Sequence, residues 1–84
     1  MKLISLLTLL CATSVNAGWY QCHCAGHRLA QQATNAACAK IPGGELIPFG
    51  NGHDCRVSNY PKAFERYCRL QNKKITGYCQ WVMG

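Results

Sequence analysis

The sequence lacks the motifs of the common catalytic classes. It has no Ser-centred nucleophile elbow, no His-Glu-x-x-His pattern and no phosphate-binding loop. It also has no Asn-x-Ser/Thr acceptor, so N-glycosylation is not expected. With 84 residues, the chain is too short for a two-domain enzyme or a large cofactor-binding fold. We therefore expect a protein without enzymatic activity and without a cofactor.

Long apolar runs are also missing, except for one near the start of the chain. A lysine at the second position precedes a run of ten mostly apolar residues at 3–12, which is too short to cross a bilayer because a spanning helix needs about 20. Val15 and Ala17 supply the small residues that signal peptidase recognises. This pattern favours a cleaved signal peptide at 1–17 over a buried core helix. The mature chain, 18–84, is then expected to be a single disulfide-rich domain that is secreted, extracellular and soluble, without a transmembrane segment.

Cysteine is abundant, with 7 residues in the whole chain. One of them, Cys11, lies in the expected leader, and the mature chain keeps an even set: Cys22, Cys24, Cys38, Cys55, Cys68 and Cys79. An even set in a short secreted chain predicts that all thiols are paired in disulfides. Each bridge typically adds about 2–4 kcal/mol to a domain that is otherwise too small to bury a large core. The pairing is left open, because this many cysteines permit many connectivities.

A zinc site is the alternative use of these cysteines. The segment Cys22-His23-Cys24 together with His27 offers side chains of the types that bind zinc. Structural zinc sites usually separate paired cysteines by about two to four residues, whereas only His23 lies between Cys22 and Cys24. The secretory context also favours oxidation of the thiols. We therefore expect disulfides and no metal.

Hydrophobic periodicity and turn residues predict six secondary-structure elements in the mature chain. They are a strand at 19–24, a helix at 27–41, a strand at 45–49, a strand at 53–57, a helix at 62–70 and a strand at 75–83. Asn51-Gly52 predicts the hairpin turn between the middle strands, and Asn59 is expected to cap the second helix. The residues expected on the inner faces of the helices are Leu29, Ala33, Ala37, Ile41, Phe64, Tyr67 and Cys68.

This order of elements predicts a small α+β fold of the split βαβ type, held together by disulfides. In this fold one four-stranded antiparallel sheet carries both helices on one face. Alternation in the first strand places Trp19, Gln21 and His23 on one face of the sheet, and Tyr20, Cys22 and Cys24 on the other. Each helix contributes one cysteine, Cys38 or Cys68, so two helix-to-sheet bridges and one strand-to-strand bridge are expected. The competing architecture is an irregular, hairpin-dominated disulfide knot with one helix.

An aromatic-Gln-Cys-x-Cys opening at 20–24 follows the leader, and an Ala- and Gln-rich helix ends near Cys38, with later single cysteines near helical aromatics. In these features the chain resembles small secreted cysteine-rich proteins of filamentous fungi, many of which are regarded as candidate effectors. The order of elements is also similar to the ferredoxin-like killer-toxin fold of one group of these proteins. Several such proteins have adjacent Cys-Cys pairs, which this chain lacks. The resemblance implies an extracellular protein that acts on a host or on competing microbes without enzymatic activity.

Basic residues outnumber acidic ones, with 9 Lys and Arg against 3 Asp and Glu. The basic residues of the second predicted helix and its end are Lys62, Arg66, Arg69, Lys73 and Lys74. The spacing of the first four places them along one side of this helix. This side is a candidate anion-binding face for phospholipid headgroups, cell-wall polyanions or an acidic receptor, and the alternative is a solvated face that keeps the protein soluble. Nucleic acid is not expected, because no aromatic side chains interleave with these cations.

Aromatic residues lie near both ends of the mature chain, at Trp19, Tyr20, Tyr78 and Trp81. In the split βαβ order the first and last strands pair, so these side chains can meet across strands. We expect them to pack the core and the sheet. The alternative is an exposed aromatic platform for a carbohydrate or a protein partner.

Together these observations predict a secreted, non-enzymatic effector-type protein. It is expected to act as a monomer by binding an unknown host or competitor protein, or an anionic cell surface. A cationic antimicrobial or killer-type toxin is the first alternative, and a protease inhibitor that inserts the loop 50–54 is the second. Acid–base catalysis, as in secreted ribonucleases, would have to use a short set of residues: His23, His27, Glu45, His53, Asp54 and Glu65.

Overall fold

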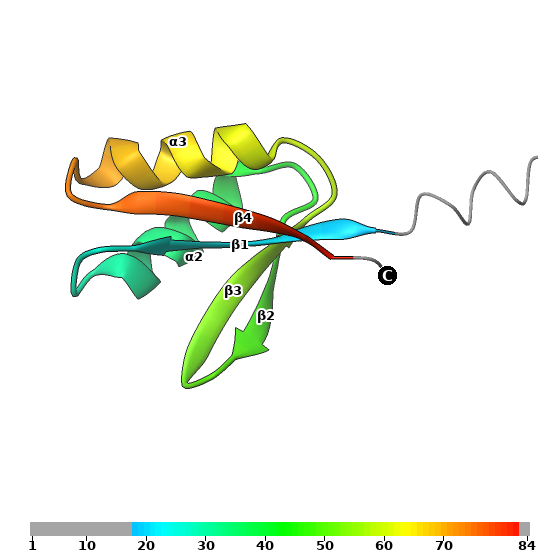
Figure 1. Cartoon of the computed structure of the whole chain (residues 1–84), viewed down its shortest axis with the longest axis horizontal. Helices are drawn as coiled ribbons and strands as arrows, with labels where there is room; N and C mark the ends of the chain where they lie inside the picture. The colour runs from blue at the N-terminus through cyan, green and yellow to red at the C-terminus, as the bar shows by residue number, and fades with distance from the viewer. Residues whose placement is uncertain (1–17, 83–84) are drawn as a thin grey trace, which may run out of the picture.

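Figure 1 shows the arrangement of the chain in a computed structural model, which describes residues 18–82. The elements are β1 (Trp19–Ala25), α2 (Ala30–Lys40), β2 (Glu45–Phe49), β3 (Gly52–Val57), α3 (Pro61–Gln71) and β4 (Thr76–Val82). All the expected elements are present in the expected order. The expected leader at 1–17 and Met83, at the end of the last expected strand, lie outside the described residues.

The four strands form one antiparallel sheet in the order β2-β3-β1-β4. β1 and β2 are connected through α2, but β3 lies between them in the sheet, which defines the split βαβ arrangement. β1 pairs with β4 from Trp19 to Ala25, whereas it pairs with β3 only from Tyr20 to Cys22. The β2–β3 hairpin therefore diverges from the rest of the sheet (Figure 1). The predicted α+β fold is confirmed, and the one-helix knot is wrong.

Three disulfides connect the elements. The bonded pairs are Cys22–Cys79 between β1 and β4, Cys24–Cys68 between β1 and α3, and Cys38–Cys55 between α2 and β3. Two bridges join a helix to the sheet and one joins two strands, which confirms the predicted distribution. Directly opposite residues of neighbouring strands share a face, and Cys22 lies opposite both Cys55 and Cys79. The strand half-cystines thus occupy one face of the sheet, and two of the bridges hold the helices against that face.

The core between the helices and the sheet is small and rich in sulfur. Five of the eleven buried hydrophobic residues are half-cystines. The buried positions of α2 include Ala33 and Ala37, whose short side chains let this helix approach the sheet closely. The largest fully buried side chain is Phe64 of α3. In a core of this size the disulfides are a main source of stability.

A glycine in β4 allows α3 to approach the sheet. A Cβ atom on Gly77 would lie 2.6 Å from Cα of Glu65 and 3.0 Å from Sγ of Cys68. A side chain therefore does not fit at this position unless α3 moves. Gly77 lies opposite Cys24 in the register, so the close approach is at the Cys24–Cys68 bridge.

The first helix begins later than the sequence pattern predicts. α2 starts at Ala30 rather than His27, because the chain first makes a turn in which the carbonyl oxygen of His27 accepts a hydrogen bond from the Ala30 N–H at 2.9 Å. Leu29 occupies the N-cap position and is 40% exposed. Its predicted place on the inner face of the helix is therefore wrong.

The N-cap of α3 also differs from the expectation. The residue at this position is Tyr60, with φ 65°, rather than Asn59, and no side chain caps the helix. The helix starts at Pro61, whose ring disfavours a helical conformation for the residue before it. Tyr60 therefore leaves the right-handed helical region and takes the N-cap position, and Asn59 makes no capping hydrogen bond.

The hairpin turn lies one residue earlier than predicted. Phe49 pairs with Gly52, so the two turn residues are Gly50 and Asn51 rather than Asn51 and Gly52. Gly50 has φ 59°. Glycine at the first central position is typical of the type II′ turn, which matches the twist of the strands.

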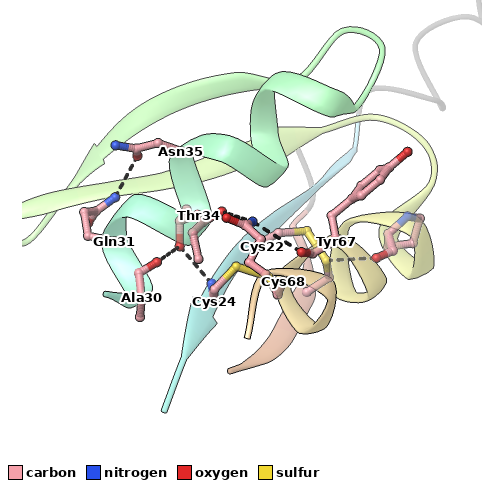
Figure 2. The surroundings of a disulfide bond; sticks show 12 residues. Cys22, Cys24, Ala30, Gln31, Thr34, Asn35, Tyr67 and Cys68 are labelled. Atoms are coloured by element: carbon pink, nitrogen blue, oxygen red, sulfur yellow. Dashed lines mark hydrogen bonds between the residues drawn. A yellow bond between two sulfur atoms is a disulfide. The ribbon is translucent and has the colours of Figure 1, made fainter. Parts of the chain in front are cut away.

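Two side chains of α2 form hydrogen bonds with backbone groups of β1 and β3 where these strands separate. The Thr34 hydroxyl accepts a hydrogen bond from the Cys24 N–H at 2.9 Å and donates one to the carbonyl oxygen of Ala30 at 2.9 Å (Figure 2). The Gln31 amide donates to the carbonyl oxygen of His53 at 3.0 Å and accepts from its N–H at 3.0 Å. These side chains supply hydrogen-bond partners to backbone groups that have no neighbouring strand at this point.

The variant Thr34→Val tests this replacement of strand pairing. It keeps the shape of the side chain but removes the acceptor of the Cys24 N–H in a buried part of the fold. We expect the free energy of unfolding to fall by about 1–3 kcal/mol, the cost of an unsatisfied buried donor. Chemical denaturation of the oxidised protein measures the change. Thr34→Ser keeps the hydroxyl and is the control, and an equal loss in both variants would assign the effect to the methyl group.

Candidate functional site

One face of the sheet has no helix over it within residues 18–82. The half-cystines and both helices lie on the other side, and the alternation of side chains directs the intervening strand residues to this uncovered face. The register brings Gln21 opposite both Arg56 and Gln80, and His23 opposite Tyr78. The sequence prediction that Trp19, Gln21 and His23 share a face away from Cys22 and Cys24 agrees with this register.

A shallow hollow of about 510 Å³ lies on the uncovered face. Its lining residues are Gln21, His23, Phe49, Asp54, Tyr78, Cys79 and Gln80. A smaller hollow of about 250 Å³ opens in the gap between β1 and the hairpin, and it shares His23, Phe49 and Asp54 with the first. The two hollows therefore adjoin, and the divergence of the hairpin from β1 creates this recess in the sheet surface.

A carboxylate lines both hollows. Asp54 is 7% exposed, and its Oδ2 accepts a hydrogen bond from Nε2 of Gln21 at 2.8 Å. This is the one side-chain hydrogen bond that the carboxylate makes within residues 18–82. Asp54 lines both hollows, so its side chain contributes a charged group to the recess.

Aromatic rings border the same hollow. The Tyr78 and His23 rings are stacked, with centroids 5.5 Å apart and planes at 29°, and Tyr78 remains 52% exposed. Phe49, on the hairpin, is 60% exposed. Nearby, the Arg56 guanidinium lies 4.7 Å from the centroid of the Trp19 ring. Exposed aromatic surface and polar groups are thus combined in one place.

The predicted contact between aromatics of the first and last strands is confirmed. Tyr20 and Trp81 lie opposite each other, and their rings meet edge to face at 5.0 Å on the helix side of the sheet. Trp81 is nevertheless 49% exposed. Its ring therefore both packs against Tyr20 and remains accessible to solvent. Neither the exposed Phe49 ring in the hollow nor the stacking of His23 on Tyr78 was predicted from the sequence. The signal for His23 was available, since it shares a strand face with Trp19.

Only three of the five predicted basic residues lie on α3. Lys62, Arg66 and Arg69 are exposed on α3 and surround a shallow hollow of about 220 Å³ together with Glu65. The acidic side chain among them offsets part of their charge.

The other two predicted basic residues are not on the helix. The helix ends at Gln71, and Asn72 is extended, with its Oδ1 accepting a hydrogen bond from the Lys74 N–H at 2.8 Å. Lys73 and Lys74 therefore lie in the turn before β4. The prediction that Lys73 lies on the helix side was wrong, because the Asn72 side chain stabilises a turn instead of another helical residue.

The residues considered for acid–base catalysis and for protease inhibition do not form a common site. His23, His53 and Asp54 line the smaller hollow, whereas the remaining candidates for acid–base catalysis, His27, Glu45 and Glu65, do not line either hollow. The segment considered as an inhibitory loop is not a free loop, because residues 52–54 belong to β3 and pair with residues 47–49.

The cysteines that a zinc site would need, Cys22 and Cys24, are oxidised in separate disulfides. None of the helices in the part of the chain that the structure describes is long and apolar enough to cross a membrane. Comparisons of the chain with protein-family models, with curated proteins and with solved structures find no match. The function is therefore inferred from the residues and their arrangement.

Proposed function

We propose that this chain is a secreted, non-enzymatic protein of the effector type, which binds a target on a host or competitor cell. Three disulfides fit a small extracellular cysteine-rich protein, because such bonds persist in oxidising compartments. The observation that supports binding is the uncovered sheet face, where exposed aromatic and polar side chains surround a hollow on a cross-linked scaffold.

The disulfides hold the binding face in one arrangement. Gln21 and His23 flank Cys22, Asp54 precedes Cys55, and Tyr78 and Gln80 flank Cys79. Each of these five lining residues is therefore next to a half-cystine in the sequence. The other two lining residues are Cys79, which is itself a half-cystine, and Phe49. Side chains that are fixed before binding lose little conformational entropy on binding. This arrangement suits recognition of a target.

Retention on living cells tests the proposed function. The oxidised protein, labelled at its C-terminus, is applied to plant cells and to fungal cells at micromolar concentration. We expect saturable retention on at least one cell type, without growth inhibition and without leakage of anionic vesicles. Reduced and alkylated protein is the control and should not be retained. Absence of retention from every cell type, or leakage at the same concentration, would contradict the proposal.

The cationic toxin remains the second candidate, because Lys62, Arg66 and Arg69 are exposed together on one helix. If it is correct, the triple variant with Gln at these positions should lose binding to anionic vesicles. Binding of the unaltered protein should also weaken between about 10 mM and 150 mM salt, because screening shortens the reach of exposed charges. The variant Arg28→Gln/Lys40→Gln/Arg56→Gln removes the same number of exposed charges elsewhere and is the matched control. Vesicle binding that ignores both salt and the triple variant would exclude a role for this helix.

A further inference from the structure

We infer that the hollow between Tyr78 and Phe49 on the uncovered sheet face binds a neutral saccharide chain, with Asp54, Gln21 and Gln80 as its polar contacts. This inference rests on the proposed binding function and names the chemical class of its target. The hollow has a volume of about 510 Å³, within the range of about 300–1,000 Å³ that small-molecule sites occupy.

The charges at the hollow disfavour an anionic ligand. No lysine or arginine is among its lining residues, and the carboxylate of Asp54, at 7% exposure, lies in its wall. An anion placed here would meet a like charge in a partly desolvated site, without a cation in the lining to compensate it. A cationic ligand is disfavoured by the excess of basic residues, 9 Lys and Arg against 3 Asp and Glu over the whole chain, and by Arg56, which lies outside the lining but opposite Gln21. A neutral ligand fits this balance of charges best.

The polar groups exclude a purely apolar ligand. Covering the Gln21 and Gln80 amides and the Asp54 carboxylate with hydrocarbon would leave hydrogen-bonding groups of these side chains unpaired. Hydroxyl groups satisfy both kinds of partner, because each donates and accepts a hydrogen bond while the amides offer donors and acceptors. A hydroxyl that donates to the ionised carboxylate of Asp54 makes a charge-assisted bond, which is stronger than a neutral one.

The aromatic rings complete the match to a sugar. A pyranose has hydroxyl groups around its edge and C–H groups on its faces, and these faces pack on aromatic rings. Tyr78 is 52% exposed and its ring is held by the stack with His23, while Phe49 is 60% exposed on the hairpin. The rings come from β4 and from β2, and the carboxylate and amide of Asp54 and Gln21 come from the strands between them. Apolar and polar contacts are therefore arranged as a neutral pyranose requires.

Nuclear magnetic resonance titration of the secreted, oxidised protein tests this inference. The probes are cellotetraose, mannotetraose and tetra-N-acetylchitotetraose, with tetragalacturonate and tetralysine as charged comparators. We expect at least one neutral tetrasaccharide to cause saturable shifts of the backbone amides of Gln21, His23, Tyr78 and Gln80. The charged probes should leave these resonances unchanged.

Two matched variants locate the site. Tyr78→Ala should weaken binding of the active tetrasaccharide about tenfold, through loss of an aromatic contact. Trp81→Ala removes an aromatic of similar exposure from the same strand but from the opposite face, and should leave the affinity unchanged. Asp54→Asn keeps the shape of the side chain and should weaken binding several-fold. Circular dichroism of each variant confirms that the fold is kept, and a variant that fails this check is replaced by Tyr78→Ser or Gln80→Ala.

The possible failures are distinguishable. If no neutral probe shifts these amides at about 10 mM, which is well above a weak millimolar Kd, the saccharide inference is overturned. Retention on cells would then still support the proposed function. Binding of tetralysine at the same residues would also overturn it, in favour of a cationic ligand. Equal effects of Tyr78→Ala and Trp81→Ala would show that the uncovered face is not the site.

Discussion

Replacing Cys24 and Cys68 together by alanine is expected to lower the free energy of unfolding by about 3 kcal/mol. These two residues are 44 positions apart in the sequence, but the Cys22–Cys79 bridge, which stays intact, already joins the chain close to them. The additional loop runs from Cys24 through that bridge to Cys68 and has about 13 residues, and a cross-link that closes such a loop restricts the unfolded chain by about that amount. Small domains are stable by only about 5–15 kcal/mol in total, so the loss is a large share. Guanidinium denaturation of the variant and of the unaltered oxidised protein measures it.

The pair Cys38→Ala and Cys55→Ala is the matched comparison. The half-cystines of both bridges are at most 5% exposed, so the loss of packing is similar in the two variants. The second bridge closes a loop of 17 positions, and the same relation gives about 3 kcal/mol for it as well. The two variants should therefore lose similar stability, although the cysteines of the first bridge are much farther apart in the sequence. A difference of more than about 1 kcal/mol between them would show that restriction of the unfolded chain is not the main effect of these bonds.

Phe64→Ala is expected to destabilise the protein by about 3–5 kcal/mol. Phe64 is 0% exposed and is the largest fully buried side chain, in a core where most other buried positions are alanine or half-cystine. The disulfides limit how far the small residues around it can move to fill the cavity. Thermal and chemical denaturation, with the disulfides intact, measure the loss.

Leu70→Ala on the same helix is the control for this substitution. Leu70 is 71% exposed, so its truncation should change stability by no more than about 0.5 kcal/mol. Both variants remove a large hydrophobic side chain from α3 and leave alanine, which favours the helix. Similar losses in the two would mean that helix propensity or the unfolded state, and not burial, sets the effect.

The fold could be predicted because its local signals agree with one another. Alternation around Cys22 and Cys24 indicated a strand with two buried sulfurs, and both residues are at most 5% exposed. The errors lie at the ends of elements, where competing interactions decide. The turn at His27, the conformation of Tyr60 before Pro61 and the Asx turn at Asn72 each involve only a few residues and leave no periodic pattern.

The candidate site was harder to predict, because it depends on register and on divergence between strands. The stacking of His23 on Tyr78 follows from the pairing of β1 with β4, which aligns two residues far apart in sequence. The hollow exists because β3 leaves β1 after the pair Cys22 and Cys55. No local pattern specifies where a hairpin diverges, since side chains of α2 make up the lost hydrogen bonds.

Along β1, β3 and β4, residues that face the helices alternate with residues that face the uncovered side of the sheet. The residues on the helix side include the half-cystines that cross-link the fold, whereas their neighbours on the uncovered side form no disulfides. Substitutions at exposed positions away from such features usually change stability by no more than about 0.5 kcal/mol. Descendants of such a chain can exchange the outward residues while the sulfur framework stays the same, so that specificity evolves without the fold having to change.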